Sequence, residues 1–138
     1  MDTRVIVERI HPGAQLPLKA HPSDACYDLM AYQDQVVEPG SHAVIALGIS
    51  LEMEDGWEAQ IRGRSGLAKR GIVVHCGTID HLYRLELKVL VHNHSPEAWR
   101  IHPGDRIAQM KISRVWDVEI VEGEVSPTDR GGLGSTGR

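Results

Sequence analysis

The stretch HAVIALGISLEMEDGWEAQIR, residues 42–62, has the composition of β-strands joined by a tight turn. Residues 42–53 and 56–62 are rich in β-branched and other apolar side chains, a pattern typical of strands. The sequence EDG at 54–56 lies between them and is typical of a turn. This stretch therefore predicts consecutive strands.

The same pattern recurs along the chain, and most of the segments that carry it alternate apolar with polar residues. Further strands are predicted at residues 4–10, 84–93, 106–112 and 115–123. Turn residues separate the strands, as in EPGS at 38–41 and HPGD at 102–105. The one persuasive helical segment is RSGLAKRG at 64–71, which Gly71 ends. Many short strands between such turns predict an all-β sandwich or barrel with one short helix.

The chain of 138 residues is long enough for one domain with its own core, which we place at residues 1–125. The remaining residues, 126–138, include the sequence DRGGLGSTGR and have the periodicity of neither a helix nor a strand. We expect them to form a flexible C-terminal arm. Hydrophobic residues make up 41% of the chain and charged residues 25%, which is typical of a globular protein.

Charge and hydropathy argue against several classes of protein. The formal net charge of −4 argues against a general nucleic-acid binder, which usually carries a basic stripe. No apolar run approaches the ~18 residues of a membrane span, and the charged start MDTRVIVERI does not resemble a signal peptide. We expect a cytoplasmic protein, or one of the host cytoplasm if it is viral, with Cys26 and Cys76 as free thiols.

The segment GRSGLAKRG has the residues of an anion site. Arg64 and Ser65 precede Gly66 at the start of the predicted helix. Backbone N–H groups, a hydroxyl and a guanidinium together suit a phosphate. The alternative is a surface turn with an incidental arginine.

The segment HCGTIDHLYR, residues 75–84, places Asp80 among apolar neighbours. A partly desolvated carboxylate can act as a general base, and Gly77 permits a tight turn beside it. The alternative is that Asp80 only caps a turn.

Polar residues also interrupt two other apolar, strand-like segments. Asp28 lies within ACYDLMA, and Arg106 and Gln109 lie within GDRIAQMKI. Buried polar groups need partners, and for Asp28 these would be an arginine or a hydrated cation.

Several histidines and one cysteine raise the question of a zinc site. These residues are His75, Cys76, His81, His92 and His94. Their spacing does not match that of structural zinc ligands. His92 and His94 would share one face of a strand, which suits either a ligand pair or a polar surface.

Taken together and in order, these segments resemble the five motifs of the trimeric dUTPase family. The matching segments are ACYDLMA (25–31), GRSGLA (63–68), GTIDHLYR (77–84), GDRIAQMKI (104–112) and GGLGSTG (131–137). The resemblance covers nearly the whole chain. It implies a jelly-roll-like β fold and a homotrimer with active sites at subunit interfaces. It also implies that the C-terminal arm closes over the nucleotide in a neighbouring subunit's site.

The family's activity is hydrolysis of dUTP to dUMP and pyrophosphate. By resemblance, Asp80 would orient a water for attack on the α-phosphorus, and Asp28 would act through water on a Mg²⁺ that bridges phosphate oxygens. The residues that would hold the triphosphate are Arg64, Ser65, Gly66, Gln109, Arg130, Ser135 and Thr136. The residues that would contact deoxyuridine are Gly77, Ile79, Tyr83 and Leu133.

The sequence departs from the family pattern at four places. Leu133 stands where a phenylalanine usually stacks on the base, and Arg130 lies only three residues before it. Leu85 replaces a common glycine, and Val74 replaces a common asparagine.

Two other functions are alternatives. A dCTP deaminase of the same superfamily would carry a glutamate where this chain has Leu90. A binding or regulatory module would keep the nucleotide pocket without turnover.

Overall fold

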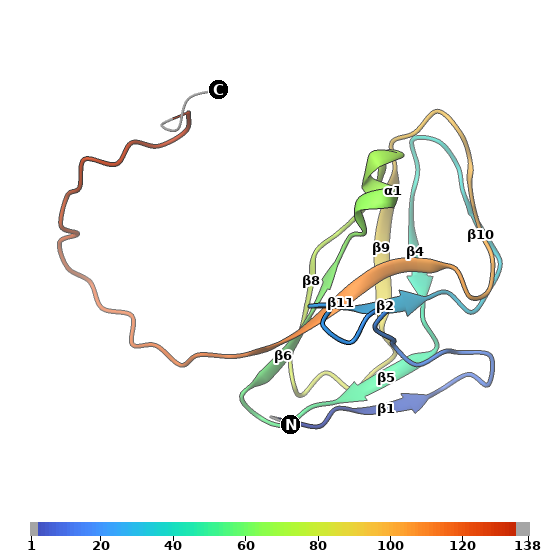
Figure 1. Cartoon of the computed structure of the whole chain (residues 1–138), viewed down its shortest axis with the longest axis horizontal. Helices are drawn as coiled ribbons and strands as arrows, with labels where there is room; N and C mark the ends of the chain where they lie inside the picture. Colours follow the sequence, from blue (N-terminus) through green and yellow to red (C-terminus); the bar gives the residue numbers. More distant parts are fainter. Residues whose placement is uncertain (1–2, 135–138) are drawn as a thin grey trace.

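Antiparallel strands make up almost all of the regular structure, as the sequence predicts (Figure 1). The computed structural model describes residues 3–134. The elements are β1 (Ile6–Arg9), β2 (Tyr27–Met30), β3 (Gln35–Val37), β4 (His42–Ala46), β5 (Ile49–Glu52), β6 (Trp57–Arg62), α1 (Ser65–Lys69), β7 (Ile72–Val74), β8 (Gly77–Ile79), β9 (Lys88–Asn93), β10 (Trp99–Ile101) and β11 (Arg106–Arg114). The prediction of an all-β fold with one short helix is confirmed.

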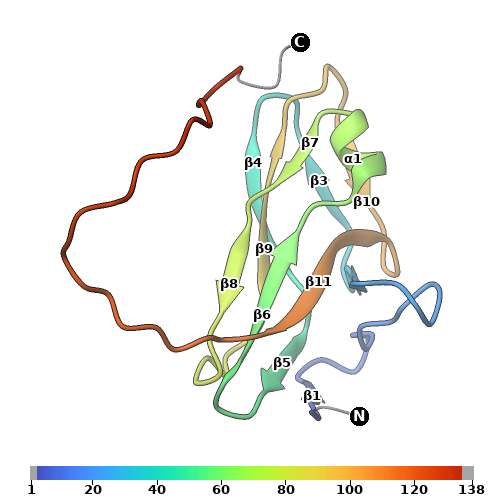
Figure 2. The same ribbon diagram turned by 60° about the vertical axis from the view of Figure 1, so that its left-hand side comes forward.

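Two larger sheets enclose the core. One has the strand order β2-β11-β6-β8, the other has the order β4-β9-β7, and two-stranded ribbons β1-β5 and β10-β3 complete the body. Leu29 and Ile61 of the first sheet and Ile45 and Val91 of the second belong to one cluster of buried apolar side chains. The architecture is a jelly-roll-like sandwich, in which helix α1 lies at the opposite end from β1 (Figure 2).

Strand β9 shows why the alternating pattern fits this fold. Lys88, Leu90 and His92 are exposed, while the three residues between and after them are buried. Successive side chains of a strand point to opposite faces, so one face of β9 enters the core and the other faces outward.

The buried Asn93 ties the end of β9 to the neighbouring ribbon. Its side-chain amide donates to the carbonyls of Val37 at 2.9 Å and Glu97 at 2.8 Å. Its Oδ1 accepts from the backbone N–H of Ser95 at 3.0 Å and from the Ser95 hydroxyl at 2.7 Å. A fully buried amide is tolerated here because its donors and its acceptor are all used.

Two predicted strands have different bounds in the structure. The predicted strand at 42–53 is two strands, because Gly48 adopts a φ of +71° and turns the chain between β4 and β5. The predicted strand at 84–93 begins only at Lys88, since residues 84–87 form part of a loop.

The predicted strand at 115–123 is wrong. The chain leaves the sheet after Arg114, and residues 115–123 have no regular secondary structure. Their alternation suits a strand, but no described strand of the same chain pairs with them, and Trp116 is 75% and Ile120 87% exposed. Both views show the segment extending away from the body.

Within residues 3–134, no helix is long and apolar enough to cross a membrane.

Candidate functional site

An open pocket of about 600 Å³ lies between the loop before β2, β2 itself, the start of α1 and β11. Its lining brings together five of the residues predicted from three separate motifs. These are Asp28, Arg64, Ser65, Gly66 and Gln109. The pocket is therefore assembled from segments up to about 80 residues apart in the chain, through strand pairing.

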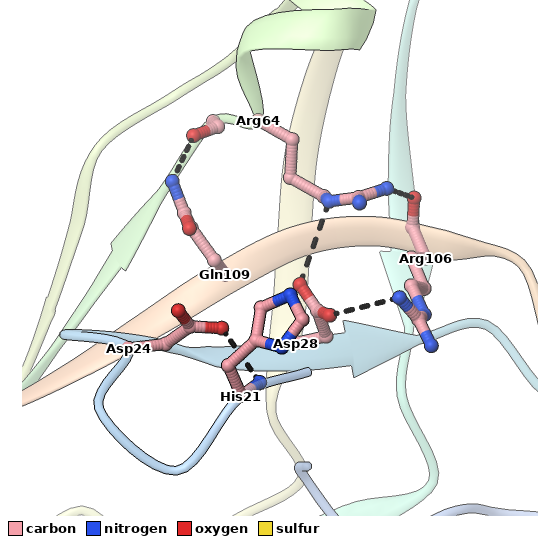
Figure 3. A network of polar contacts seen from close by, with 7 residues as sticks. His21, Asp24, Asp28, Arg64, Arg106 and Gln109 are labelled. Atoms are coloured by element: carbon pink, nitrogen blue, oxygen red, sulfur yellow. Dashed lines mark hydrogen bonds and ion pairs between the residues drawn. The ribbon is translucent and has the colours of Figure 1, made fainter. Parts of the chain in front are cut away.

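Asp28 lies between two arginines in this pocket (Figure 3). Its Oδ1 is 3.4 Å from Nε of Arg64, and its Oδ2 is 3.4 Å from Nη1 of Arg106. The Asp28 side chain is only 14% exposed. The partner that this carboxylate requires is thus supplied by arginine, one of the two partners that the sequence predicts.

Two further hydrogen bonds hold the start of α1 against β11. Nε2 of Gln109 donates to the carbonyl of Gly63 at 2.8 Å, and Nη1 of Arg64 donates to the carbonyl of Arg106 at 3.2 Å. Gln109 also lies opposite Asp28 in the pairing of β11 with β2. These contacts fix the turn that carries Ser65 and Gly66, and a Cβ added at Gly66 would meet nothing within 4 Å.

The charge of the pocket favours an anion. Its lining contains three arginines, at 64, 70 and 106, and two aspartates, at 24 and 28, which gives a net charge of +1. Guanidinium groups bind phosphate through paired N–H donors. The arrangement suits a phosphate chain more than a neutral ligand.

The residues predicted to act on the other end of the nucleotide lie elsewhere in the chain. Asp80 follows β8, whereas Asp28 is on β2, and β11 and β6 separate these two edges of the sheet. Gln109 pairs with both Asp28 and Arg62, while Ile79 pairs with Ala59 three residues along β6. From strand spacing and rise, Asp80 and Asp28 are roughly 20 Å apart. One chain therefore does not bring the predicted base to the pocket that contains Asp28.

Gly77 and Ile79 form the ends of β8, and Tyr83 belongs to the turn that follows. The backbone N–H of Tyr83 donates to the carbonyl of Asp80 at 3.0 Å, and the Tyr83 hydroxyl donates to the carbonyl of Glu86 at 2.9 Å. Four predicted residues thus make a second cluster: Gly77, Ile79, Asp80 and Tyr83.

The structure accommodates two of the departures from the family pattern. Within residues 3–134, only glycines have a positive φ. The backbone of Leu85 therefore does not adopt the left-handed conformation that would require a glycine at this position. Val74 is 7% exposed and belongs to the core, so its side chain fills space inside the sandwich.

The C-terminal segment that carries Arg130 and Leu133 runs away from the body of the molecule (Figure 1), and both residues are exposed. The predicted Ser135 and Thr136 lie outside the described residues.

Arg106, Arg70 and Asp24 line the pocket but were not assigned a role from sequence. The sequence indicates that Arg106 needs a partner, because it is a charged residue in an otherwise apolar strand, and Asp28 is that partner. Asp24 accepts a hydrogen bond from the backbone N–H of His21 at 2.9 Å, and nothing in its sequence context distinguishes it from a turn residue. Among residues 3–134, no three His, Cys, Asp or Glu side chains are grouped to hold a metal ion.

Comparison with known proteins identifies the family. The dUTPase family profile matches residues 13–137. The deoxyuridine 5'-triphosphate nucleotidohydrolase of Solibacter usitatus is 44% identical over 142 residues, covering 98% of this chain and 97% of its own length. The enzyme of the same name from Hydrogenobaculum sp. is 45% identical over 141 residues, covering 97% and 98%.

Solved structures agree with the sequence comparison. A mutant dUTPase of Staphylococcus bacteriophage 80alpha, solved with dUpNHpp, has a TM-score of 0.84 and 25% identity, and covers 97% of this chain and 98% of its own. A mutant dUTPase from phage phi11 of S. aureus, described with a structural Mg(II) ion, has a TM-score of 0.80 and covers 88% of this chain and 97% of its own. Because it is only 23% identical, it shows likeness of fold alone. With the profile, the relatives and the fold in agreement, the chain belongs to the dUTPase family.

Proposed function

We propose that this protein hydrolyses dUTP to dUMP and pyrophosphate, with a water oriented by Asp80 attacking the α-phosphorus. The observation that carries the proposal is the match to the dUTPase profile over residues 13–137, which includes every residue placed in the site. A pocket of net charge +1 with three arginines in its lining is consistent with a triphosphate.

The triphosphate-binding residues are Arg64, Ser65, Gly66 and Gln109 in the pocket. Arg64 offers a guanidinium, and the turn held by Gln109 offers a hydroxyl and backbone N–H groups. On the arm, Arg130, Ser135 and Thr136 add further donors when the arm closes. Glycines in the arm allow its backbone to approach phosphate closely.

The active enzyme is a homotrimer, as the resemblance to the trimeric dUTPases implies. A site shared between subunits is supported by the separation of roughly 20 Å between the base and the phosphate pocket within one chain. A neighbouring copy brings Asp80, Gly77, Ile79 and Tyr83 to the pocket. The exposed apolar residues of 115–125 support association, since large apolar side chains left in water favour burial against a partner. The arm then reaches the site of a neighbour, where Leu133 covers the base.

Mg²⁺ fits the chemistry of the pocket but not a cage built by protein side chains. Asp28 and Asp24 offer carboxylate oxygens, the ligands that this cation prefers. Because Asp28 is already paired with two arginines, it would hold the ion through water, with substrate phosphates as the main ligands. When bound, Mg²⁺ would neutralise charge on the triphosphate.

On the uracil side, Tyr83 would lie against the deoxyribose, and the backbone near Gly77 and Ile79 would read the base. The Tyr83 hydroxyl is already bonded to the carbonyl of Glu86, which fixes the ring for such a contact. A site of this kind discriminates by steric contact and by leaving the polar groups of a wrong ligand unpaired. We place the protein in the cytoplasm, or in the host cytoplasm if it is viral.

A deaminase activity has little support from the local geometry. Leu90, at the position of the deaminase glutamate, lies on the exposed face of β9. The nearby Glu86 accepts a hydrogen bond from the backbone N–H of Gly48 at 3.0 Å. Leucine has no proton to transfer, and the Glu86 carboxylate is already engaged by the Gly48 backbone.

The test is a nucleotide panel of dUTP, dCTP, dTTP and UTP with Mg²⁺, assayed for pyrophosphate release and for the nucleotide product. The expected result is fast cleavage of dUTP alone, with a loss of at least about 100-fold in Asp80→Asn, since a general base contributes about that much. Formation of dUTP or dUMP from dCTP would indicate a deaminase. Equally slow turnover by wild type and Asp80→Asn would indicate a binding module.

A further inference from the structure

We propose that Arg84 is a positioning residue, which holds the turn carrying Asp80 in place by pairing with Glu52, and that His81 assists by pairing with Asp55. This proposal rests on the proposed function, because it assigns the turn its catalytic position. These contacts, which we call the brace, would join the loop at residues 80–87 to the end of the β1-β5 ribbon and the turn that follows it.

The base of the loop is fixed by backbone hydrogen bonds. The N–H of Leu87 donates to the carbonyl of Ile49 at 2.8 Å, and the N–H of Leu47 donates to the carbonyl of Leu87 at 3.0 Å. Leu87 is also fully buried. The end of the loop next to β9 is therefore held firmly by the start of β5.

The tip of the loop has no such support from apolar packing. Leu82 is 73% exposed and Leu85 is 72% exposed, so neither side chain anchors the tip in the core. Within the loop, the bond from Tyr83 N–H to the Asp80 carbonyl closes the turn but does not attach it to the body.

At its start the turn follows β8, which pairs with β6 up to Ile79, and after Tyr83 the Glu86 carboxylate accepts a hydrogen bond from the Gly48 backbone N–H at 3.0 Å. Between these two attachments, the orientation of the turn depends on further side-chain contacts.

Two side-chain pairs supply those contacts: an Arg–Glu ion pair, and a His–Asp contact that is an ion pair only when the imidazole is protonated. Nη1 of Arg84 is 3.1 Å from Oε1 of Glu52, at the end of β5. Nε2 of His81 is 3.5 Å from Oδ1 of Asp55, in the turn between β5 and β6. Glu52 is itself held in register, because it pairs with Ile6 of β1.

The two pairs lie on either side of Tyr83 in the sequence and end on the same stretch, 52–55. A single contact would leave the turn free to pivot, whereas two contacts limit its rotation. The pairs are largely exposed, so each contributes little to stability. Their effect falls on the placement of Asp80, to which a reaction is far more sensitive.

The experiment compares Arg84→Ala, Glu52→Ala, the double variant and the charge swap Glu52→Arg/Arg84→Glu. Arg100→Ala serves as the matched control, because it removes an exposed arginine from β10, far from the loop. Measurements are kcat and KM for dUTP, thermal stability, and hydrogen exchange at the Tyr83 amide, which reports closure of the turn.

Each single variant is expected to lower kcat about three- to tenfold with KM changed less than about twofold, as expected for a loss of orientation with binding retained. The double variant is expected to be no worse than the singles, because both remove one interaction. The charge swap restores at least about half of the lost kcat by re-forming the pair with opposite polarity. Replacing His81 or Asp55 with Ala is expected to give a smaller loss of the same kind.

Some results would overturn the proposal. If Arg84 contacted the substrate, Arg84→Ala would raise KM, Glu52→Ala would be silent, and the charge swap would not recover activity. Unchanged kcat in both single variants would also overturn it. If wild type does not cleave dUTP, the proposed function fails on its own. The brace is then judged by Tyr83 exchange, which should accelerate in both single variants but not in Arg100→Ala.

Discussion

The most informative single substitution in the phosphate pocket is Asp28→Asn. It keeps the size of the side chain but removes the charge between Arg64 and Arg106. The two ion pairs, each at 3.4 Å, correspond to an attraction of about 5 kcal/mol apiece at an effective dielectric constant of about 20.

Most of that attraction is offset by water and by the cost of burying the carboxylate. Arg64 is 35% and Arg106 is 51% exposed, which weakens both pairs. Removing one member of a fully buried pair costs about 3–5 kcal/mol, and of an exposed pair at most about 1 kcal/mol. We therefore expect Asp28→Asn to lower the free energy of unfolding by about 1–3 kcal/mol.

The assay is urea unfolding at neutral pH, in low salt and in 1 M NaCl, with Asp24→Asn as the matched control. Asp24 lines the same pocket, but its side chain accepts a hydrogen bond from the His21 backbone N–H and forms no ion pair with Arg64 or Arg106. The control should lose less than about 1 kcal/mol, since asparagine can also accept that bond. The excess loss in Asp28→Asn should shrink in high salt.

A second arm of the assay adds inorganic pyrophosphate without Mg²⁺. Asp28→Asn raises the pocket charge from +1 to +2 and leaves two guanidinium groups in need of a partner. Pyrophosphate should therefore stabilise this variant more than wild type, although turnover of dUTP falls. Equal stability of the Asp28 and Asp24 variants, or equal stabilisation of variant and wild type by pyrophosphate, would refute this reading of the pocket.

Three further predictions concern the fold and its assembly. Asn93→Ala should lower the free energy of unfolding in chemical denaturation by about 2–4 kcal/mol, because the carbonyls of Val37 and Glu97 lose their donor. The control Gln35→Ala, which removes one exposed hydrogen bond, should lower it far less. Gly48→Ala should be more destabilising than Gly40→Ala in thermal unfolding, since both glycines have a positive φ but only at Gly48 would a Cβ come within 3.0 Å of neighbouring side chains; equal losses would exclude a clash. Truncation after Arg114 should prevent formation of the proposed trimer, as measured by sedimentation, whereas truncation after Ser126 should leave the trimer intact but remove most turnover. If the chain truncated after Arg114 still forms a trimer, the exposed apolar segment 115–125 does not hold the subunits together.

The alternating strands could be predicted from the sequence, because period-two patterning directly reflects a sheet with one buried face. The three-residue strands β3, β7, β8 and β10 could not, since so few residues show no period. The segment 115–123 has the composition of a strand, but composition does not say whether a partner strand is present.

The site was predicted as a set of residues rather than as an arrangement. Asp28 and Gln109 stood out because polar side chains in apolar strands need partners, and the structure supplies them. The separation between Asp80 and Asp28 depends on strand order and register, which no local pattern encodes. The pairing of Arg84 with Glu52 depends in the same way on loop geometry between distant segments.

Complementation between two inactive variants tests most directly whether the catalytic site is shared between subunits. The Asp80→Asn and Arg64→Ala variants are mixed, unfolded and refolded together, and pyrophosphate release from dUTP is compared with each variant refolded alone. If Asp80 serves the pocket of a neighbour, random assembly gives an intact base and an intact arginine in about one quarter of the sites, with activity to match. Mixed trimers that form but remain as inactive as their parents would contradict a site built from two subunits.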